Sequence, residues 1–361
     1  MNARIAAILV VLLAVLGGGA LLLQREETAR RPANAGGLGQ RLLKDLKAAD
    51  IAAIRIVEPK VGKGTEASGK GPEAATLTLQ RKDDGWVIAE RDGFPADAAK
   101  VRGFVLNAIE LKVGQSEPIG EKDRARLNLD EPGKKSETGA TQVEFAGADG
   151  KALAKLLVGK KYFKREVDNP GRAPADGRFV MRPEDPATVY TVSDPLAQAN
   201  ARSAEWIERS GFKVEKLKTL EVRYPSGDGW RIERAADNAD WKLAGAKPGE
   251  KLEITKANAA SYSLGLLELA DVASKETTGD GATTGLDKPT LINATTLAGV
   301  SYEIKVGRPE QDNYYVAFTS SSDQPRDKLL ARYVLLLPKS KLEDTLKPRA
   351  ELLEKKDAGK K

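Results

Sequence analysis

The sequence predicts an α+β protein in which an N-terminal transmembrane helix precedes two tandem repeats, each an antiparallel sheet with one packed helix. Three observations predict this fold class. An uncharged apolar run opens the chain, and one order of strand, helix and turn signals then occurs twice. The composition, with 41% hydrophobic and 30% charged residues, is that of a globular protein. The 361 residues suffice for two or three domains.

The apolar run extends from Ile5 to Leu23 without a charged or polar side chain. As a helix at about 1.5 Å per residue it spans roughly 28 Å, close to the ~30 Å hydrocarbon core of a bilayer. We therefore predict a single-pass anchor, with residues 1–24 as a cytoplasmic tip and transmembrane helix. A cleaved signal peptide is the alternative, because Gly18 and Ala20 form a small-x-small pair.

The charges beside this span do not by themselves fix its orientation. Arg4 precedes the span, whereas Arg25, Arg30, Arg31 and Arg41 follow it, so the positive-inside count places the folded part in the cytoplasm. A short tail, one span and a long polar domain are instead typical of an exported protein, and large domains cross largely regardless of charge.

The rest of the chain divides by composition and pattern. Residues 25–40 are polar and Gly-rich and predict a linker. We predict a first α+β repeat over 41–210 and a second over 211–352. Residues 353–361 form a basic tail.

Each repeat begins with strands and continues with a helix. Alternating apolar residues predict first-repeat strands over 51–57, 76–80, 86–88, 141–145, 153–158, 178–181 and 189–192. The corresponding second-repeat strands are predicted over 217–224, 230–234, 241–243, 291–295, 302–306, 314–318 and 333–337. Asp97 is positioned to cap the first helix, with Ala98, Val101, Val105 and Ala108 as its apolar stripe. Thr255 is the predicted cap of the second, with Ala259, Tyr262, Leu266 and Leu269.

Two short motifs recur after each helix. Leu129-Asp130-Glu131-Pro132 matches Leu286-Asp287-Lys288-Pro289, and Val158-Gly159-Lys160 matches Val306-Gly307-Arg308. Asn128 and Gly285 precede the first motif, and both types accept a left-handed backbone, so we predict a turn at this point. The shared order of Trp, helix, LDxP turn and VG turn indicates an internal duplication.

Several chemistries are excluded by composition. The chain has no histidine and no cysteine, which rules out catalytic triads, zinc sites and haem or iron–sulfur centres that need them. Gly64 to Lys70 resembles a P-loop, but Gly71 and Pro72 stand where a magnesium ligand and a helix are required. No calcium-loop spacing occurs. We predict no catalytic residue, cofactor or metal. A carboxylate-dependent hydrolase would need two converging acidic side chains.

One loop stands out as a candidate interaction site: Lys160, Lys161, Tyr162, Phe163, Lys164 and Arg165 place four cations around two aromatic rings. A solvated hairpin end between two strands is the preferred explanation of this loop. The net charge of +6 comes mainly from the two ends of the chain, and neither large segment carries a concentrated positive excess, so nucleic acid is not an expected partner.

The single span, the helix start Phe94-Pro95-Ala96-Asp97, the LDxP turn and the VG turn together resemble the DUF4340 family over residues 42–350. The second repeat departs from this pattern at Leu252-Glu253-Ile254-Thr255. The resemblance implies a bacterial envelope protein, found beside gliding-motility-type ABC transporters and their membrane-anchored auxiliary subunits. It brings no known catalytic residues.

We therefore expect a non-enzymatic accessory protein in the cytoplasmic (inner) membrane, with its folded part periplasmic or extracytoplasmic. Its expected partners are ABC transporter permease or auxiliary subunits, bound through protein–protein contacts. The alternative is a binding module for an envelope glycan or another anionic ligand.

Overall fold

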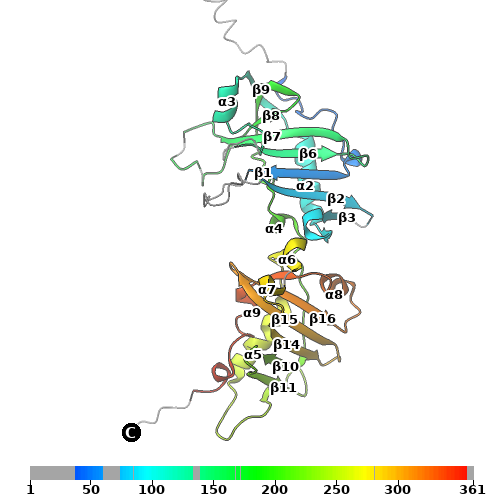
Figure 1. Cartoon of the computed structure of the whole chain (residues 1–361). Coiled ribbons are helices and arrows are strands. Elements are labelled where there is room, and N and C mark those ends of the chain that lie inside the picture. The colour runs from blue at the N-terminus through cyan, green and yellow to red at the C-terminus, as the bar shows by residue number, and fades with distance from the viewer. Residues whose placement is uncertain are drawn as a thin grey trace, which may run out of the picture. The chain divides into compact units, whose positions relative to one another are not determined.

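The computed structural model describes residues 37–59, 74–83, 85–132, 139–166, 168–170, 172–279 and 281–355. It confirms the α+β class, with two antiparallel sheets and a few helices (Figure 1). The predicted membrane span lies outside the described residues. Among the helices that are described, none is both long and apolar enough to cross a bilayer.

The first sheet has the strand order β4-β3-β2-β1-β6-β7-β8-β9-β5. Its elements are β1 (Ala53–Glu58), β2 (Ala75–Lys82), β3 (Gly85–Ile88), β4 (Phe94–Pro95), β5 (Val113–Pro118), β6 (Thr141–Ala146), β7 (Ala152–Tyr162), β8 (Gly177–Arg182) and β9 (Asp185–Val192).

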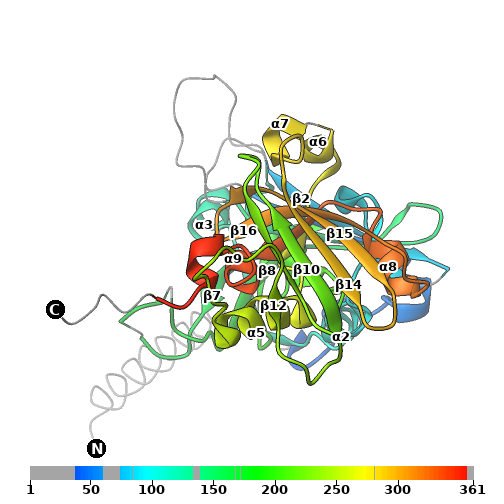
Figure 2. The ribbon, with the colours of Figure 1, turned by 90° about the horizontal axis from the view of Figure 1, so that it is seen from below.

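The second sheet has the order β12-β11-β10-β14-β15-β16-β17-β13, and Figure 2 shows β10, β14 and β15 side by side. Its elements are β10 (Leu217–Arg223), β11 (Gly229–Glu233), β12 (Lys242–Leu243), β13 (Asp271–Val272), β14 (Thr290–Thr296), β15 (Ser301–Glu310), β16 (Asn313–Ser320) and β17 (Leu335–Pro338).

All described helices except α2 and α5 are short. The described helices are α2 (Ala98–Ile109), α3 (Glu121–Arg126), α4 (Ser203–Trp206), α5 (Ile254–Tyr262), α6 (Lys275–Thr278), α7 (Gly281–Thr284), α8 (Pro325–Leu330) and α9 (Lys339–Leu342), with 3-10 turns η2 (Ala48–Asp50), η3 (Ala89–Arg91), η4 (Ser263–Leu266) and η5 (Arg349–Leu352).

The two sheets share one strand order. Apart from β4, the first sheet reads β3-β2-β1-β6-β7-β8-β9-β5, and the second reads β12-β11-β10-β14-β15-β16-β17-β13. The two orders correspond strand by strand, and in each the last strand is the one that follows the helix. The described residues up to Thr76 form a compact unit with Arg102–Ala201, and Leu77–Val101 group with the residues from Arg202 onward. The predicted boundaries at 41, 210 and 352 stay a prediction.

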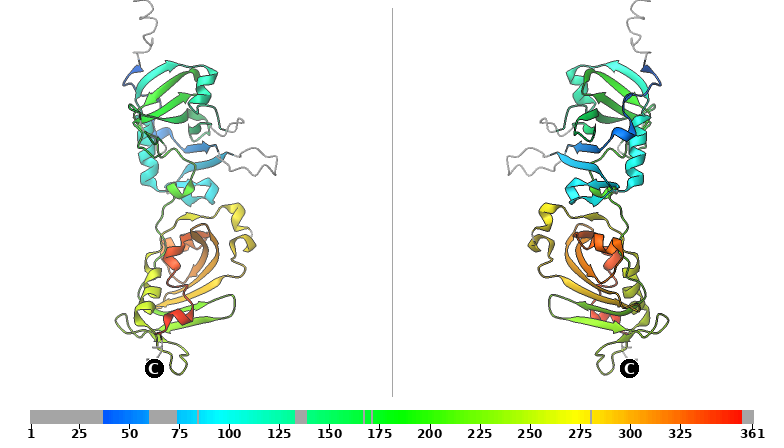
Figure 3. Two further views of the ribbon diagram at one scale, coloured as in Figure 1. Left: turned by 90° about the vertical axis from the view of Figure 1, so that its left-hand side faces the viewer. Right: turned by 90° about the vertical axis from the view of Figure 1, so that its right-hand side faces the viewer.

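Of the two predicted helix caps, Asp97 is confirmed. The Asp97 carboxylate accepts hydrogen bonds from the backbone N–H groups of Ala99 and Lys100 at 3.0 and 3.1 Å, which satisfies donors at the start of α2. Helix α2 lies along one face of the first sheet, where Phe104 stacks on Phe145 with ring centroids 6.0 Å apart (Figure 3).

The predicted cap Thr255 was wrong. Helix α5 begins one residue earlier, and the Glu253 side chain accepts the hydrogen bond from Thr255 N at 3.0 Å. The longer Glu side chain reaches the same backbone donor from outside the helix. Tyr262, predicted as part of the buried stripe, is 66% exposed, because α5 ends there and a 3-10 turn rotates the following Leu264 into the core.

The two repeated motifs contact each other in each sheet. Asn128 and Gly285 have φ values of 56° and 72°, which confirms the predicted left-handed turns. The glycine of each VG motif sits in a β-bulge, between β7 and β8 and between β15 and β16. A Cβ on Gly159 would overlap the Leu127 carbonyl, and one on Gly307 would overlap the Thr284 carbonyl. Glycine is therefore needed at both positions for this close approach.

This contact predicts that Gly159→Ala destabilises the protein by about 1–3 kcal/mol, because a backbone carbonyl cannot move aside as a side chain can. Urea denaturation measures the loss. Gly103→Ala, inside α2 with open space around its Cα, is the matched control and should stabilise by up to about 1 kcal/mol. Equal stability of Gly159→Ala and the native protein would contradict the role given to this contact.

Candidate interaction surface

The predicted basic loop begins inside a strand. Lys160, Lys161 and Tyr162 complete β7 beyond its bulge, and Phe163, Lys164 and Arg165 follow as irregular chain. The Lys160 N–H donates to Leu127 O at 2.9 Å, which places this end of β7 beside the LDxP turn. The hairpin-end interpretation therefore holds only for the second half of the loop.

The six residues differ in their roles. Lys161 Nζ donates to the carbonyls of Pro170 and Ala173 at 3.3 and 3.1 Å. These hydrogen bonds hold the loop that follows β7 against the strand. The side chains of Lys160, Lys164 and Arg165 are exposed and form no hydrogen bond or ion pair within the described part of the chain. Three cations are therefore available to a partner.

Tyr162 opens onto a cavity of about 340 Å³, the Tyr162 cavity. Its ring meets Phe179 edge to face, with centroids 5.5 Å apart. The apolar lining comes from Pro118, Ile119, Leu127, Tyr162, Phe179 and Val189, and the polar lining from Gln115, Glu117, Asp123, Arg126 and Thr191. Ile119, Leu127 and Phe179 also pack on the buried cluster around Leu129 and Leu157, so the cavity floor is the edge of the core.

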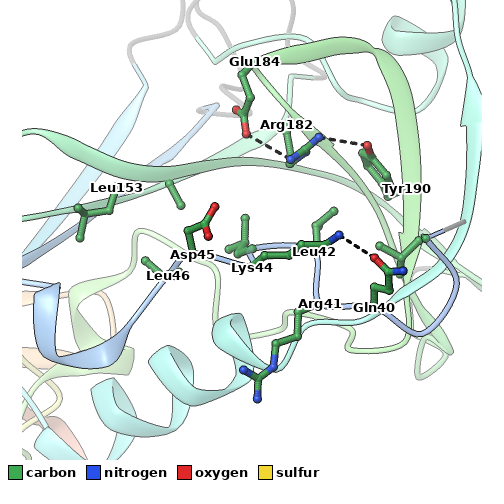
Figure 4. A pocket seen from close by; sticks show the side chains of 14 residues that line it. Gln40, Arg41, Leu42, Lys44, Asp45, Leu46, Leu153, Arg182, Glu184 and Tyr190 are labelled. Atoms are coloured by element: carbon green, nitrogen blue, oxygen red, sulfur yellow. Dashed lines mark hydrogen bonds and ion pairs between the residues drawn. The ribbon is translucent and has the colours of Figure 1, made fainter.

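A second cavity, of about 320 Å³, opens on the opposite face of the same strands and is called here the Arg182 cavity (Figure 4). Successive strand residues point to opposite faces. Tyr190 of β9 lines this cavity, whereas its neighbours Val189 and Thr191 line the Tyr162 cavity.

The chain that precedes β1 forms one wall of the Arg182 cavity. Gly39 N donates to Val113 O at 2.8 Å, Val113 N to Gln40 O at 3.0 Å, and Leu42 N to Leu111 O at 2.7 Å. These bonds fix residues 39–42 along the start of β5. The wall therefore includes Gln40, at the end of the predicted linker, together with Lys44 and Asp45.

Arg182 lies across from this wall without a short contact. Its Nη1 is 3.9 Å from the Glu184 carboxylate, and its Nη2 is 3.6 Å from Asp185 and 3.4 Å from the Tyr190 hydroxyl. Its Nε is buried and has no hydrogen-bond partner among the described residues, as is also true of Arg124, Arg326 and Arg349. Asp185 instead accepts hydrogen bonds from Tyr190 Oη at 2.9 Å and Thr188 Oγ1 at 3.1 Å. The guanidinium also lies over the Tyr190 ring, 5.6 Å from its centroid, so its own chain holds it by long contacts only.

The second sheet shows what a fully bonded arginine looks like. Arg234 is buried and donates to Leu217 O at 2.7 Å and to the Asp237 carboxylate at 2.6 Å. Its guanidinium lies 4.6 Å from the Trp241 ring centroid, and Trp241 Nε1 donates to Asn258 in α5 at 3.1 Å. Although Arg234 lines a hollow of about 650 Å³, its donors are committed to β10 and to the loop at Asp237.

The acidic residues give a mixed picture. In the described ranges, no three acidic side chains gather closely enough to hold a metal ion. Asp45 and Glu184 line the same cavity from two distant segments, a pairing that no sequence pattern revealed. The only available signal was the polar hairpin Arg182-Pro183-Glu184-Asp185 between two predicted strands.

Tyr190 makes this site sensitive to alkaline pH. Burial raises the pKa of its phenol, the hydrogen bond to Asp185 raises it further, and the Arg182 charge opposes both effects. Because the folded pKa lies above the unfolded value of about 10, the stabilisation is present below that pH and is lost as the pH rises through the folded pKa.

The free energy of unfolding of the native protein should therefore fall when the pH is raised from about 8 to about 11. In the Tyr190→Phe variant this decrease should be smaller, because the titrating phenol is absent. Urea denaturation at the two pH values measures the difference. Tyr262→Phe, at a 66% exposed position, is the control. A Tyr190→Phe variant with the same pH dependence as the native chain would show that this phenol does not titrate against folding.

The comparisons with known proteins identify one family. A family model described as "Domain of unknown function (DUF4340)" matches residues 86–289, which is more than half of the chain. The match runs from Trp86 in β3 to Pro289 of the second LDxP turn, so it includes both turns. Neither the curated proteins nor the solved structures contain a match. The chain belongs to the DUF4340 family.

Proposed function

We propose that this chain is a non-enzymatic accessory protein of an ABC transporter complex, anchored in the inner membrane by residues 5–23 and acting outside the cytoplasm through protein–protein contacts. The observation that carries the proposal is the surface formed by Lys160, Lys164, Arg165 and the Tyr162 cavity. Exposed cations beside a half-buried aromatic pair suit an acidic partner segment with an apolar side chain.

The common strand order supports the further proposal that the folded part arose by duplication. Both sheets also carry the same bulge against the same turn. The basic loop occurs in the first sheet alone, because residues 308–313 at the corresponding place are not basic. A shared scaffold with one specialised loop is what a duplicated recognition protein requires.

Four carboxylates with lowered pKa values are paired within the chain itself. Hydrogen bonds from Lys151, Ser210, Arg349 and Lys328 lower the pKa of Asp149, Glu208, Glu250 and Asp323, respectively. A general acid at neutral pH needs the opposite shift. These four groups are instead held as anions for pairing.

Reversing the three free charges should weaken the complex. We expect the variant Lys160→Glu, Lys164→Glu, Arg165→Glu to recover at least about tenfold less permease or auxiliary subunit in mild detergent, with a salt-dependent loss. The matched control is Lys213→Glu, Lys218→Glu, Lys242→Glu, at three exposed lysines in or just before the second sheet. Equal recovery by both variants, or no transporter subunit with the native chain, would refute the proposal.

The proposed topology has its own test. Protease added outside intact spheroplasts should digest the folded part, because this part would lie beyond the inner membrane. A cytoplasmic protein serves as the control for lysis. Full protection of the chain until the cells are lysed would place it on the cytoplasmic side.

A further inference from the structure

The Arg182 cavity has the character of a small-molecule site independent of the basic loop. Its volume of about 320 Å³ lies near the lower end of the range for ligand pockets, roughly 300–1,000 Å³. Leu42, Leu43, Leu46 and Val113 line it and are each at most 6% exposed, so part of its lining is apolar. Polar side chains supply the rest of the lining.

The rim carries balanced charge. Lys44 and Arg182 supply two cations, and Asp45 and Glu184 supply two anions. Arg41 also borders the cavity but points away from it toward its ion-pair partner Glu110 (Figure 4). Lys44 Nζ donates to Gln40 at 2.6 Å, and Asp45 has no bonded partner within the described residues. The rim therefore offers both donors and acceptors.

Arg182 defines the anionic end of a ligand. Its one hydrogen bond is long, at 3.4 Å, and its ion pairs with Glu184 and Asp185 are 3.9 and 3.6 Å long, so part of its hydrogen-bonding capacity is unused. A planar guanidinium pairs best with a carboxylate or phosphate through two parallel hydrogen bonds. A phosphate monoester would bring almost two negative charges beside Asp45 and Glu184, whereas a carboxylate brings one.

Asp45 and Glu184 define the rest of the ligand. Carboxylates on the rim accept hydrogen bonds from hydroxyl groups and repel a second anion. The apolar part of the lining suits the C–H face of a ring. We infer that the Arg182 cavity binds a hydroxylated carboxylate of monosaccharide size, with its carboxylate on Arg182 and its hydroxyls on Asp45 and Glu184.

The test uses glucuronate as the probe and the full chain in a detergent without a sugar headgroup. Glucuronate should bind saturably by calorimetry, and more tightly than glucose or acetate, each of which lacks half of the recognised groups. Arg182→Gln should weaken binding at least about tenfold. Arg172→Gln, at an exposed arginine outside the cavity, should leave binding unchanged.

A second variant separates recognition from folding. Asp45→Asn keeps the shape of an exposed turn residue. It should weaken the binding of glucuronate severalfold and leave the binding of acetate unaffected. Absence of saturable glucuronate binding, equal binding of acetate or glucose, or unchanged binding by Arg182→Gln would each overturn the inference. The charge-reversal variant at Lys160, Lys164 and Arg165 tests transporter binding, and none of these residues lines the Arg182 cavity. Failure of the proposed function can therefore be distinguished from failure of glucuronate binding.

Discussion

The contact between a bulged glycine and an LDxP turn organises each sheet. At Gly159 and Gly307 the absence of a Cβ lets a strand pass directly over a carbonyl of the turn. The bulge also turns the Gly159 carbonyl toward Arg178, whose Nη1 donates to it at 2.8 Å. In each sheet the turn comes after the helix, α2 or α5, and before four consecutive strands, β6–β9 or β14–β17. The contact therefore helps to set where these four strands lie.

Much of the fold could be predicted because the strands alternate cleanly. The β1, β6 and β14 segments were located to within two residues from their apolar periodicity. Strand β5 was not predicted, because its sequence Val-Gly-Gln-Ser-Glu-Pro lacks alternation and its place at the edge buries little. The two-residue β13 is too short to leave a pattern.

The candidate sites were less predictable for a geometric reason. The basic loop is local in sequence and was found, although Lys161 proved to be tied to its own chain. The Arg182 cavity needs Lys44, Asp45 and Arg182 from segments more than a hundred residues apart. Only the pairing of residues 39–42 with the start of β5 brings them together. Arg182 and Arg234 look alike in the sequence, yet their bonding gives them opposite roles.

The same pairing has a mechanical consequence. Any force applied through the chain before Gly39 reaches the first sheet at three backbone hydrogen bonds, to Val113 and Leu111. A pull along the strand loads all three in shear, whereas a pull across it peels them one at a time, at about 0.5–1.5 kcal/mol each. Peeling would also dismantle the wall that holds Gln40 and Lys44. Tension on the chain is thus coupled to the shape of the Arg182 cavity.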